Sequence, residues 1–334
     1  MTTGDIMDIR KATRDYAVPN DALGAFHLFN SLLLYVVAVW LGTAFWGNWP
    51  VVGFAVFLFW GASVRLFGIQ HDNGHLSFFT SKRVNFTSGV LLGAFTQNAF
   101  HAMRYNHNRH HAYIGNLDQM ESHEVLTWTV RQYQEAGFWG KVFYRTYRSA
   151  PVIFFLGPIF IIFIRYRFPK NAMKTGLMDV AIQNVLMLSL WGLIYLLGGL
   201  TAMKFLVTAL IISACVGVAI VYIGHNHEET YWASGPQVDF TEASLKGASV
   251  IDLGAIFDFM TFNFAYHDLH HLNSKVPCYN LKACHVALSE HLNPTRLGFW
   301  EAVACIQWKL WDEDQSKMVR FSDLKPLPKM HPAE

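Results

Sequence analysis

Residues 51–75 read VVGFAVFLFWGASVRLFGIQHDNGH, an apolar segment that runs directly into two histidines four residues apart. A helix needs about 20 mainly apolar residues to cross a membrane, and residues 51–69 come close to that length. Their only charged residue, Arg65, lies near the end of the segment, where a long side chain can reach the interface. The stretch therefore predicts a transmembrane helix that places His71 and His75 just beyond its end.

Three further segments share this composition: residues 26–46, 178–200 and 205–224. The links GNWP and TAMK join the four segments in pairs, which predicts two helical hairpins. Residues 90–100 are too short to span a bilayer, and residues 152–164 are short and contain Pro158. We expect both of these to form re-entrant or interfacial helices.

The overall composition also indicates a membrane protein. Hydrophobic residues make up 52% of the 334 residues and charged residues only 15%, whereas a soluble protein carries about 25% charged residues. The net charge of +2 is too balanced to suggest a nucleic-acid partner. We therefore predict an all-α integral membrane protein that forms a single domain over residues 1–334.

Basic residues set the predicted orientation. They gather before the first span and between the two hairpins, whereas the hairpin tips hold only Lys204. By the positive-inside rule, both termini and the central section are predicted to be cytoplasmic. The four transmembrane helices would then support a cytoplasmic helical cap.

Eight histidines fall into three groups with helical spacing. The groups are His71 and His75; His107, His110 and His111; and His267, His270 and His271. Residues three and four apart share a helix face, so we expect each group to direct its imidazoles toward one point. All three groups fall on the predicted cytoplasmic side, near the membrane surface. The pattern predicts a nitrogen-rich metal site in the cap.

The number of histidines indicates two metal ions. Imidazole binds zinc, copper, nickel and iron, but a zinc site usually takes three or four protein ligands. A dinuclear site beside apolar helices implies chemistry on an apolar substrate, whose C–H bonds require a strong oxidant. Two irons that react with O₂ can supply that oxidant, whereas zinc has no redox chemistry.

The sequence around these groups resembles the histidine boxes of the integral membrane fatty acid desaturases, especially the bacterial acyl-lipid enzymes. HDNGHLSFF and HNRHHAYIGNLD are similar to the first and second boxes, and HDLHHLNSKVPCYNL is similar to the third. GHNHEETYW looks like the segment QHxxExxYW of that group. The resemblance covers about residues 50–290.

The resemblance implies a nine-histidine di-iron site. It makes the eight histidines above iron ligands and adds His225, which matches a further histidine of this subfamily. Gly224 departs from the usual glutamine, and His227 stands where an apolar residue is usual. His227 could be a spare ligand, a supporting group or simply an interfacial histidine.

Five polar residues within or beside the boxes are candidates to support the ligands. Four are carboxylates that could accept the second N–H of a ligating imidazole: Asp72, Asp118, Glu228 and Asp268. The fifth is Asn263, four residues before His267, which could hold a water on the metal.

The resemblance implies an enzyme that uses two iron ions and O₂ to place a cis double bond in a lipid-linked fatty acyl chain. The substrate would lie in an apolar channel lined by the second and fourth spans. The chain has no cytochrome b5 haem motif and no cysteine cluster, so we expect a separate electron donor, a ferredoxin, on the basic cytoplasmic section. The expected location is the bacterial inner membrane. The TYW and YNL sequences most resemble the delta-12, omega-6 type.

Two other functions remain open at this point. The same scaffold could serve a di-iron hydroxylase, epoxygenase or ketolase that acts on a lipid or carotenoid. A membrane metal transporter is a remote alternative, since it would place ionisable ligands inside the spans near the midplane. Here the spans are nearly free of histidine, aspartate and glutamate.

Overall fold

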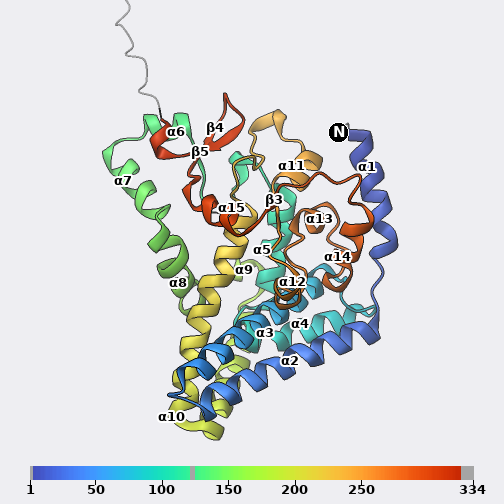
Figure 1. Ribbon diagram of the computed structural model, residues 1–334, viewed down its shortest axis with the longest axis vertical. Helices are drawn as coiled ribbons and strands as arrows, with labels where there is room; N and C mark the ends of the chain where they lie inside the picture. Colours follow the sequence, from blue (N-terminus) through green and yellow to red (C-terminus); the bar gives the residue numbers. More distant parts are fainter. Residues whose placement is uncertain (1–2, 121–124, 325–334) are drawn as a thin grey trace, which may run out of the picture.

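Long helices fill the lower half of the molecule in Figure 1, and shorter helices gather above them. The computed structural model describes residues 3–120 and 125–324, so residues 1–2 and 325–334, at the two predicted cytoplasmic ends, lie outside the described residues. The longer helices are α1 (Thr3–Ala12), α2 (Asp21–Ala44), α3 (Trp49–His75), α4 (Lys82–Thr96), α5 (Phe100–Tyr113), α7 (Phe138–Tyr147), α10 (Leu177–Gly224) and α14 (Cys278–Ala287). The shorter ones are α6 (Val130–Glu135), α8 (Gly157–Phe163), α9 (Ala172–Thr175), α11 (Phe240–Lys246), α12 (Ala255–Met260), α13 (His267–Leu272) and α15 (Phe299–Ala304).

Helices α2 and α3 begin at asparagine caps and pack side by side. Asn20 accepts a hydrogen bond from the N–H of Leu23, and Asn48 caps α3 in the same way. Along the contact, Tyr35 packs on Phe59 with 4.8 Å between ring centroids. Helix α3 continues unbroken past residue 69, where the sequence predicts the end of the span, as far as His75. The first histidine pair therefore lies on the last turns of a helix that is itself largely buried.

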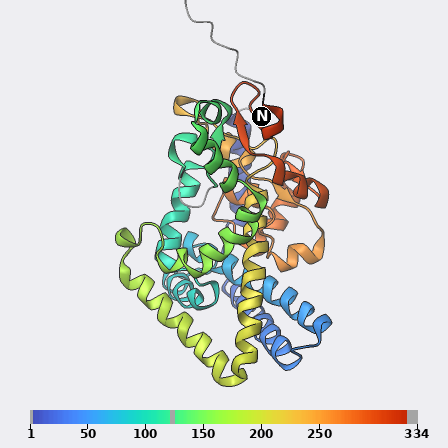
Figure 2. The ribbon, with the colours of Figure 1, turned by 90° about the vertical axis from the view of Figure 1, so that its left-hand side faces the viewer.

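The third and fourth predicted spans are the two arms of α10. Gly199 interrupts this helix with φ 62° and ψ −156°, a conformation that only glycine adopts readily. Figure 2 shows the two arms, coloured lime and yellow, meeting near the bottom of the molecule. The sequence predicts the turn at residues 201–204, but the backbone turns at the preceding glycine and these four residues are helical. The reversal between the two arms passes through this positive φ at Gly199.

The two ambiguous apolar segments differ in structure. Residues 90–96 belong to α4, which has 15 residues and is too short to cross a bilayer. Residues 152–175 are apolar and long enough to span, as are α2, α3 and α10. They do not form one regular helix, however, because a π-helical turn (Val152–Leu156) precedes α8 and a break at Ile164 follows it. Pro158 at the start of α8 cannot donate a backbone hydrogen bond to the preceding turn.

Two small sheets, which the sequence does not predict, tie distant segments together. In one, β4 (Leu310–Asp312) pairs in parallel with β1 (Trp128–Thr129) and antiparallel with β5 (Lys317–Val319). In the other, β2 (Val250–Ile251) pairs in parallel with β3 (Arg296–Leu297). Strands of two or three residues leave no periodicity in the sequence, so they were not distinguishable from loops.

Polar contacts tie α5 to α10 and α3, and tie α3 to the segment after α13. The Asp179 carboxylate of α10 accepts the backbone N–H groups of His101 and Ala102, at 3.0 and 3.1 Å, and so caps the start of α5. Arg104 of α5 donates to the carbonyl oxygen of Gly74 at 2.8 Å. Lys275, after α13, donates to the carbonyl oxygen of His75. The helices that carry the three histidine groups are thus tied together at the end of α3.

Candidate metal centre

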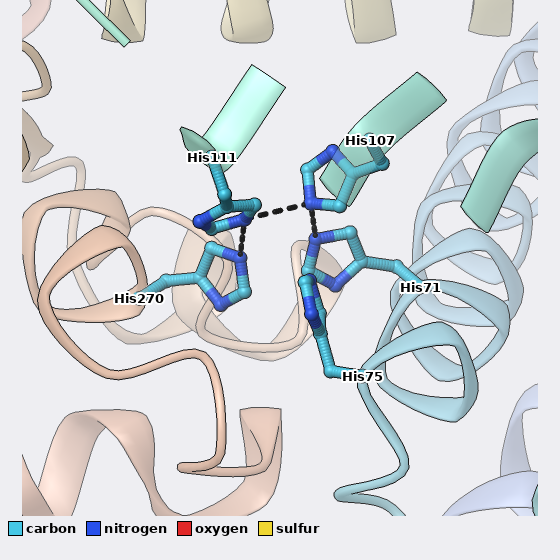
Figure 3. Close-up of side chains that lie close together, drawn as sticks. All are labelled: His71, His75, His107, His111 and His270. Atoms are coloured by element: carbon cyan, nitrogen blue, oxygen red, sulfur yellow. Dashed lines mark hydrogen bonds between the residues drawn. The ribbon is translucent and has the colours of Figure 1, made fainter. Parts of the chain in front are cut away.

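The first histidine group combines residues from three helices. Its members are His71 and His75 from α3, His107 and His111 from α5, and His270 from α13. One ring nitrogen of each lies within 4.8 Å of those of the others. Figure 3 shows the five rings turned toward a common centre. The Nε2 atom of His107 lies 2.7 Å from that of His71 and 2.9 Å from that of His111.

The second group lies beside the first. The ring nitrogens of His110, His225 and His271 lie within 4.8 Å of one another. His267 joins them, because its Nε2 atom is 2.9 Å from that of His225 and 3.1 Å from that of His271. The two groups touch where the rings of His111 and His271 approach, with 4.5 Å between centroids. The structure therefore brings all nine predicted histidines together, in a set of five and a set of four.

Each three-histidine helix divides its side chains between the two groups. On α5, His107 and His111 face the first group and His110 the second. On α13, His267 and His271 face the second group and His270 the first. The expectation that all three imidazoles of a helix meet at one point is therefore wrong. Residues i and i+4 lie about 40° apart around a helix, whereas i+3 lies on the other side of residue i, so it reaches a neighbouring point.

The geometry of the ring nitrogens fits bound metal. Two nitrogens at about 2.1 Å from one metal ion lie about 3 Å apart when the angle between them is near 90°. The Nε2 separations of 2.7–3.1 Å match this spacing. The Nε2 atom of His75 is buried and has no hydrogen-bond partner among the described residues. A bound cation would satisfy these converging lone pairs, and iron is among the metals that imidazole ligates.

Two ligand candidates have a fixed tautomer. Nδ1 of His225 donates to the carbonyl oxygen of Gly247 at 2.9 Å, which leaves Nε2 as the lone pair that faces the second group. Nδ1 of His71 lies 3.1 Å from Oδ1 of Asp72 and plays the same part in the first group. A partner on the second ring nitrogen orients a ligating imidazole and raises its basicity.

Burial keeps these imidazoles neutral, as metal ligands must be. It lowers the pKa of His110 to about 4 and, together with the nearby His110, the pKa of His225 to about 3. Burial is also the main reason that the pKa values of His107, His111, His267, His270 and His271 lie well below their usual range.

The other predicted supporting residues contact different groups. Asp118 accepts the N–H of Gly235, and Glu228 lies 3.5 Å from the Lys317 amine. Asn263 donates to the carbonyl oxygen of Cys278. The buried Asp268 faces Nδ1 of His285, at 4.0 Å. None of these four contacts is made to one of the nine ligand candidates, so adjacency to a histidine box is a weak guide to contact.

His227 is buried, and neither of its ring nitrogens has a hydrogen-bond partner among the described residues. It does not belong to either histidine group. Burial lowers its pKa to about 3. The Gly247 carbonyl, which orients His225, is a supporting group that sequence reasoning missed, because a backbone acceptor 22 residues away leaves no signal in residue type or spacing.

A cavity of about 450 Å³ adjoins both histidine groups, a volume typical of small-molecule sites. His71 and His107 of the first group line it, as do His110, His225 and His267 of the second. Its apolar walls come mainly from α3 (Val64, Phe67), α8 (Ile161, Ile162) and the second arm of α10 (Leu210, Val218, Val221). These features define a class: a helical protein of membrane type whose two histidine groups could hold metal beside an apolar cavity.

Comparison with known proteins identifies the family. A sequence model described as "Fatty acid desaturase" matches residues 47–302. A Fatty acid desaturase of Bacillus subtilis (strain 168) is 30% identical over 80% of this chain and 77% of its own. An sn-1 oleoyl-lipid 12-desaturase of Arthrospira platensis is 24% identical over 84% and 86%. An sn-1 acyl-lipid omega-3 desaturase (ferredoxin) of Nostoc sp. (strain 36) is 23% identical over 92% and 88%. The chain therefore belongs to the fatty acid desaturase family, as its histidine boxes predict, and is an oxidoreductase.

Proposed function

We propose that this desaturase places a cis double bond in a fatty acyl chain of a membrane lipid, at a di-iron centre held by the nine histidines. One observation carries the proposal: an apolar cavity is open to imidazoles of both histidine groups. When bound, two irons would activate O₂, which would then be able to remove hydrogen from an unactivated CH₂–CH₂ unit. The overall balance is one acyl CH₂–CH₂, O₂, two electrons and two protons to one CH=CH and two waters.

The protein's own residues would position the substrate and exclude water. The walls from α3 and α10 would hold the acyl chain extended past the histidines, at about 0.8 kcal/mol for each buried CH₂. Phe67 and Phe264 line the cavity beside His71. The centroid of the His71 ring lies 6.3 Å from that of Phe67 and 5.0 Å from that of Phe264. Such rings would fix which carbons face the metal site, and small displacements of the chain would be costly to the rate.

Further proposals concern the membrane location, the electron donor and the position of the double bond. We propose that α2, α3 and the two arms of α10 cross the bacterial inner membrane as two hairpins, and that the shorter helices form a cytoplasmic cap around the metal site. The electron donor would be a ferredoxin, as in the name of the Nostoc relative. The double-bond position would be delta-12, as in the name of the Arthrospira relative.

Expression in a host that makes monounsaturated but not diunsaturated lipids tests the function. The chain and its His110→Ala variant would each be expressed with a ferredoxin system, and double bonds located by mass spectrometry of total fatty acids. A new diene with the wild type alone would support desaturation and fix its position. Hydroxy, keto or epoxy products would instead establish an oxygenase on the same site. An iron-loaded wild type that leaves the lipids unchanged with either ferredoxin or cytochrome b5 would overturn the proposal.

A further inference from the structure

Arg148, at the end of α7, is a buried cation without a counter-ion among the described residues. Its guanidinium donates to Oδ1 of Asn226 at 2.8 Å and to the carbonyl oxygen of Trp308 at 3.0 Å. Two longer contacts, of 3.4 Å, reach Leu126 and Thr127. All four acceptors are neutral, and the Nε–H group has no hydrogen-bond partner among the described residues. A buried charge is costly unless it is paired, so this environment favours an anion.

A second cation increases the local positive charge. The Lys309 amine donates to the carbonyl oxygen of Arg148 at 2.7 Å. Burial and the adjacent guanidinium lower the pKa of Lys309 to about 8. The half-buried amine of Lys309 and the buried guanidinium of Arg148 repel each other, and a bound anion would relieve that repulsion.

Arg148 lines the same cavity as the histidines. Trp232 also lines it, is buried, and has an indole N–H without a partner among the described residues. Trp308 links the two residues, because its carbonyl oxygen accepts from Arg148 and its side chain packs in one cluster with Trp232. No described residue of the cavity wall is an aspartate or glutamate. This end of the cavity therefore offers hydrogen-bond donors and positive charge without a competing acid.

We propose that Arg148 and Trp232 bind a phosphate group of the substrate, so that the acyl chain enters as part of a phospholipid rather than a neutral glycolipid. This inference rests on the proposed function and specifies its substrate class. A planar guanidinium suits phosphate oxygens. Asn226, which holds Arg148, directly follows His225 of the second group. A phosphate bound there would anchor the head of the lipid at the Arg148 end of the cavity, and the acyl chain would run along the apolar walls past the histidines.

Binding measured apart from catalysis tests the proposal. The full chain, purified in neutral detergent and loaded with iron, would be titrated with phosphatidylglycerol and with monogalactosyldiacylglycerol of the same acyl chains, and bound lipid counted by native mass spectrometry. We expect wild type to prefer phosphatidylglycerol at least ten-fold. Arg148→Gln should abolish the preference, and Trp232→Phe, which keeps a large ring but loses the N–H, should reduce it several-fold. Arg131→Gln, at an exposed arginine, is the matched control and should leave it unchanged.

Three results would overturn the proposal. Equal binding of the two lipids by wild type, or an unchanged preference in Trp232→Phe and Arg148→Gln, would show that these donors do not select phosphate. Tighter binding of an acyl-CoA or of inorganic phosphate than of phosphatidylglycerol would assign the site to another phosphate source. If Arg148→Gln does not fold, Trp232→Phe decides.

The same samples separate this inference from the function itself. Wild type that forms a diene equally well from both lipids would retain the proposed function and refute phosphate selection. Wild type that binds phosphatidylglycerol selectively but forms no diene would retain the phosphate site and refute desaturation.

Discussion

At the scale of single residues, His225 offers a test of whether the second histidine group binds a metal ion of its own. Its Nε2 lone pair is fixed by the bond from Nδ1 to Gly247, and the first group keeps all five of its histidines when His225 is lost. We expect His225→Ala to bind about one iron per chain instead of about two and to lose activity at least about 100-fold. Plasma mass spectrometry of the purified protein measures the iron. His291→Ala, at an exposed histidine, is the control; two irons in both variants would exclude His225 as a ligand.

The buried imidazoles also predict how the metal-free protein responds to acid. The pKa of His110 is about 4 and that of His225 about 3 in the folded chain, against about 6.5 in the unfolded chain. Below pH 6.5 the unfolded chain binds more protons, so the free energy of unfolding should fall as the pH falls, by up to about 1.4 kcal/mol per pH unit for each histidine. Thermal unfolding of chelator-treated protein at pH 7.5 and 5.5 measures this. His110→Gln should show a smaller difference, and a melting temperature that does not change with pH would contradict the expectation.

The sequence predicted which histidines form the candidate site, but not how they divide into two groups. Helical spacing identified eight histidines, and the family resemblance added His225, which no spacing joins to the others. Spacing along one helix could not show that His110 and His270 each cross to the other group, because that depends on how α5 and α13 face each other. Arg148 contacts Asn226, 78 positions away, and Trp308, 160 positions away. No local sequence pattern predicts contacts over such separations.

At the scale of elements, the break in α10 depends on Gly199. Its φ of 62° and ψ of −156° would strain any residue with a Cβ atom, at a cost of about 1–3 kcal/mol. We expect Gly199→Ala to lower the melting temperature in detergent by several degrees. Gly192→Ala is a matched control within the same helix, where a Cβ meets no atom within 4 Å and helix propensity improves. Equal melting temperatures for the two variants would show that the turn tolerates other residues.

The prediction of helices from the sequence succeeded where apolar composition alone determines the structure. Long apolar runs predicted the helices of α2, α3 and both arms of α10, because few other structures can satisfy the backbone of such a run in lipid. It failed where tertiary contacts decide, as in the short strands β1 to β5. Helix α3 extends to His75 because cations from α5 and the segment after α13 contact its last carbonyl groups.

At the scale of the whole molecule, the cavity couples the apolar helices to the histidine groups. Its walls combine α3, α8 and the second arm of α10 with the loop that follows His225. Its length past the histidine groups should therefore limit the acyl chain that can bind. The sequence predicted the second and fourth spans as walls, and both contribute. It did not predict α8 or Arg148 as wall residues, since their place depends on packing against α10.

Gly217 offers a direct test of that cavity. It lines the wall on α10, and a Cβ built there meets no atom within 4 Å, so a larger side chain would enter the cavity without displacing the backbone. We expect Gly217→Phe to keep its iron but to lose activity on long acyl chains by at least about ten-fold, with shorter chains affected less, because a filled channel misplaces the reacting carbons. Competition between lipids of different acyl length, followed by mass spectrometry, measures the shift. Gly53→Phe, on the exposed side of α3 with equal room for a Cβ, is the matched control and should keep the wild-type profile. If both variants accept the same chains as wild type, the acyl chain does not pass this part of α10.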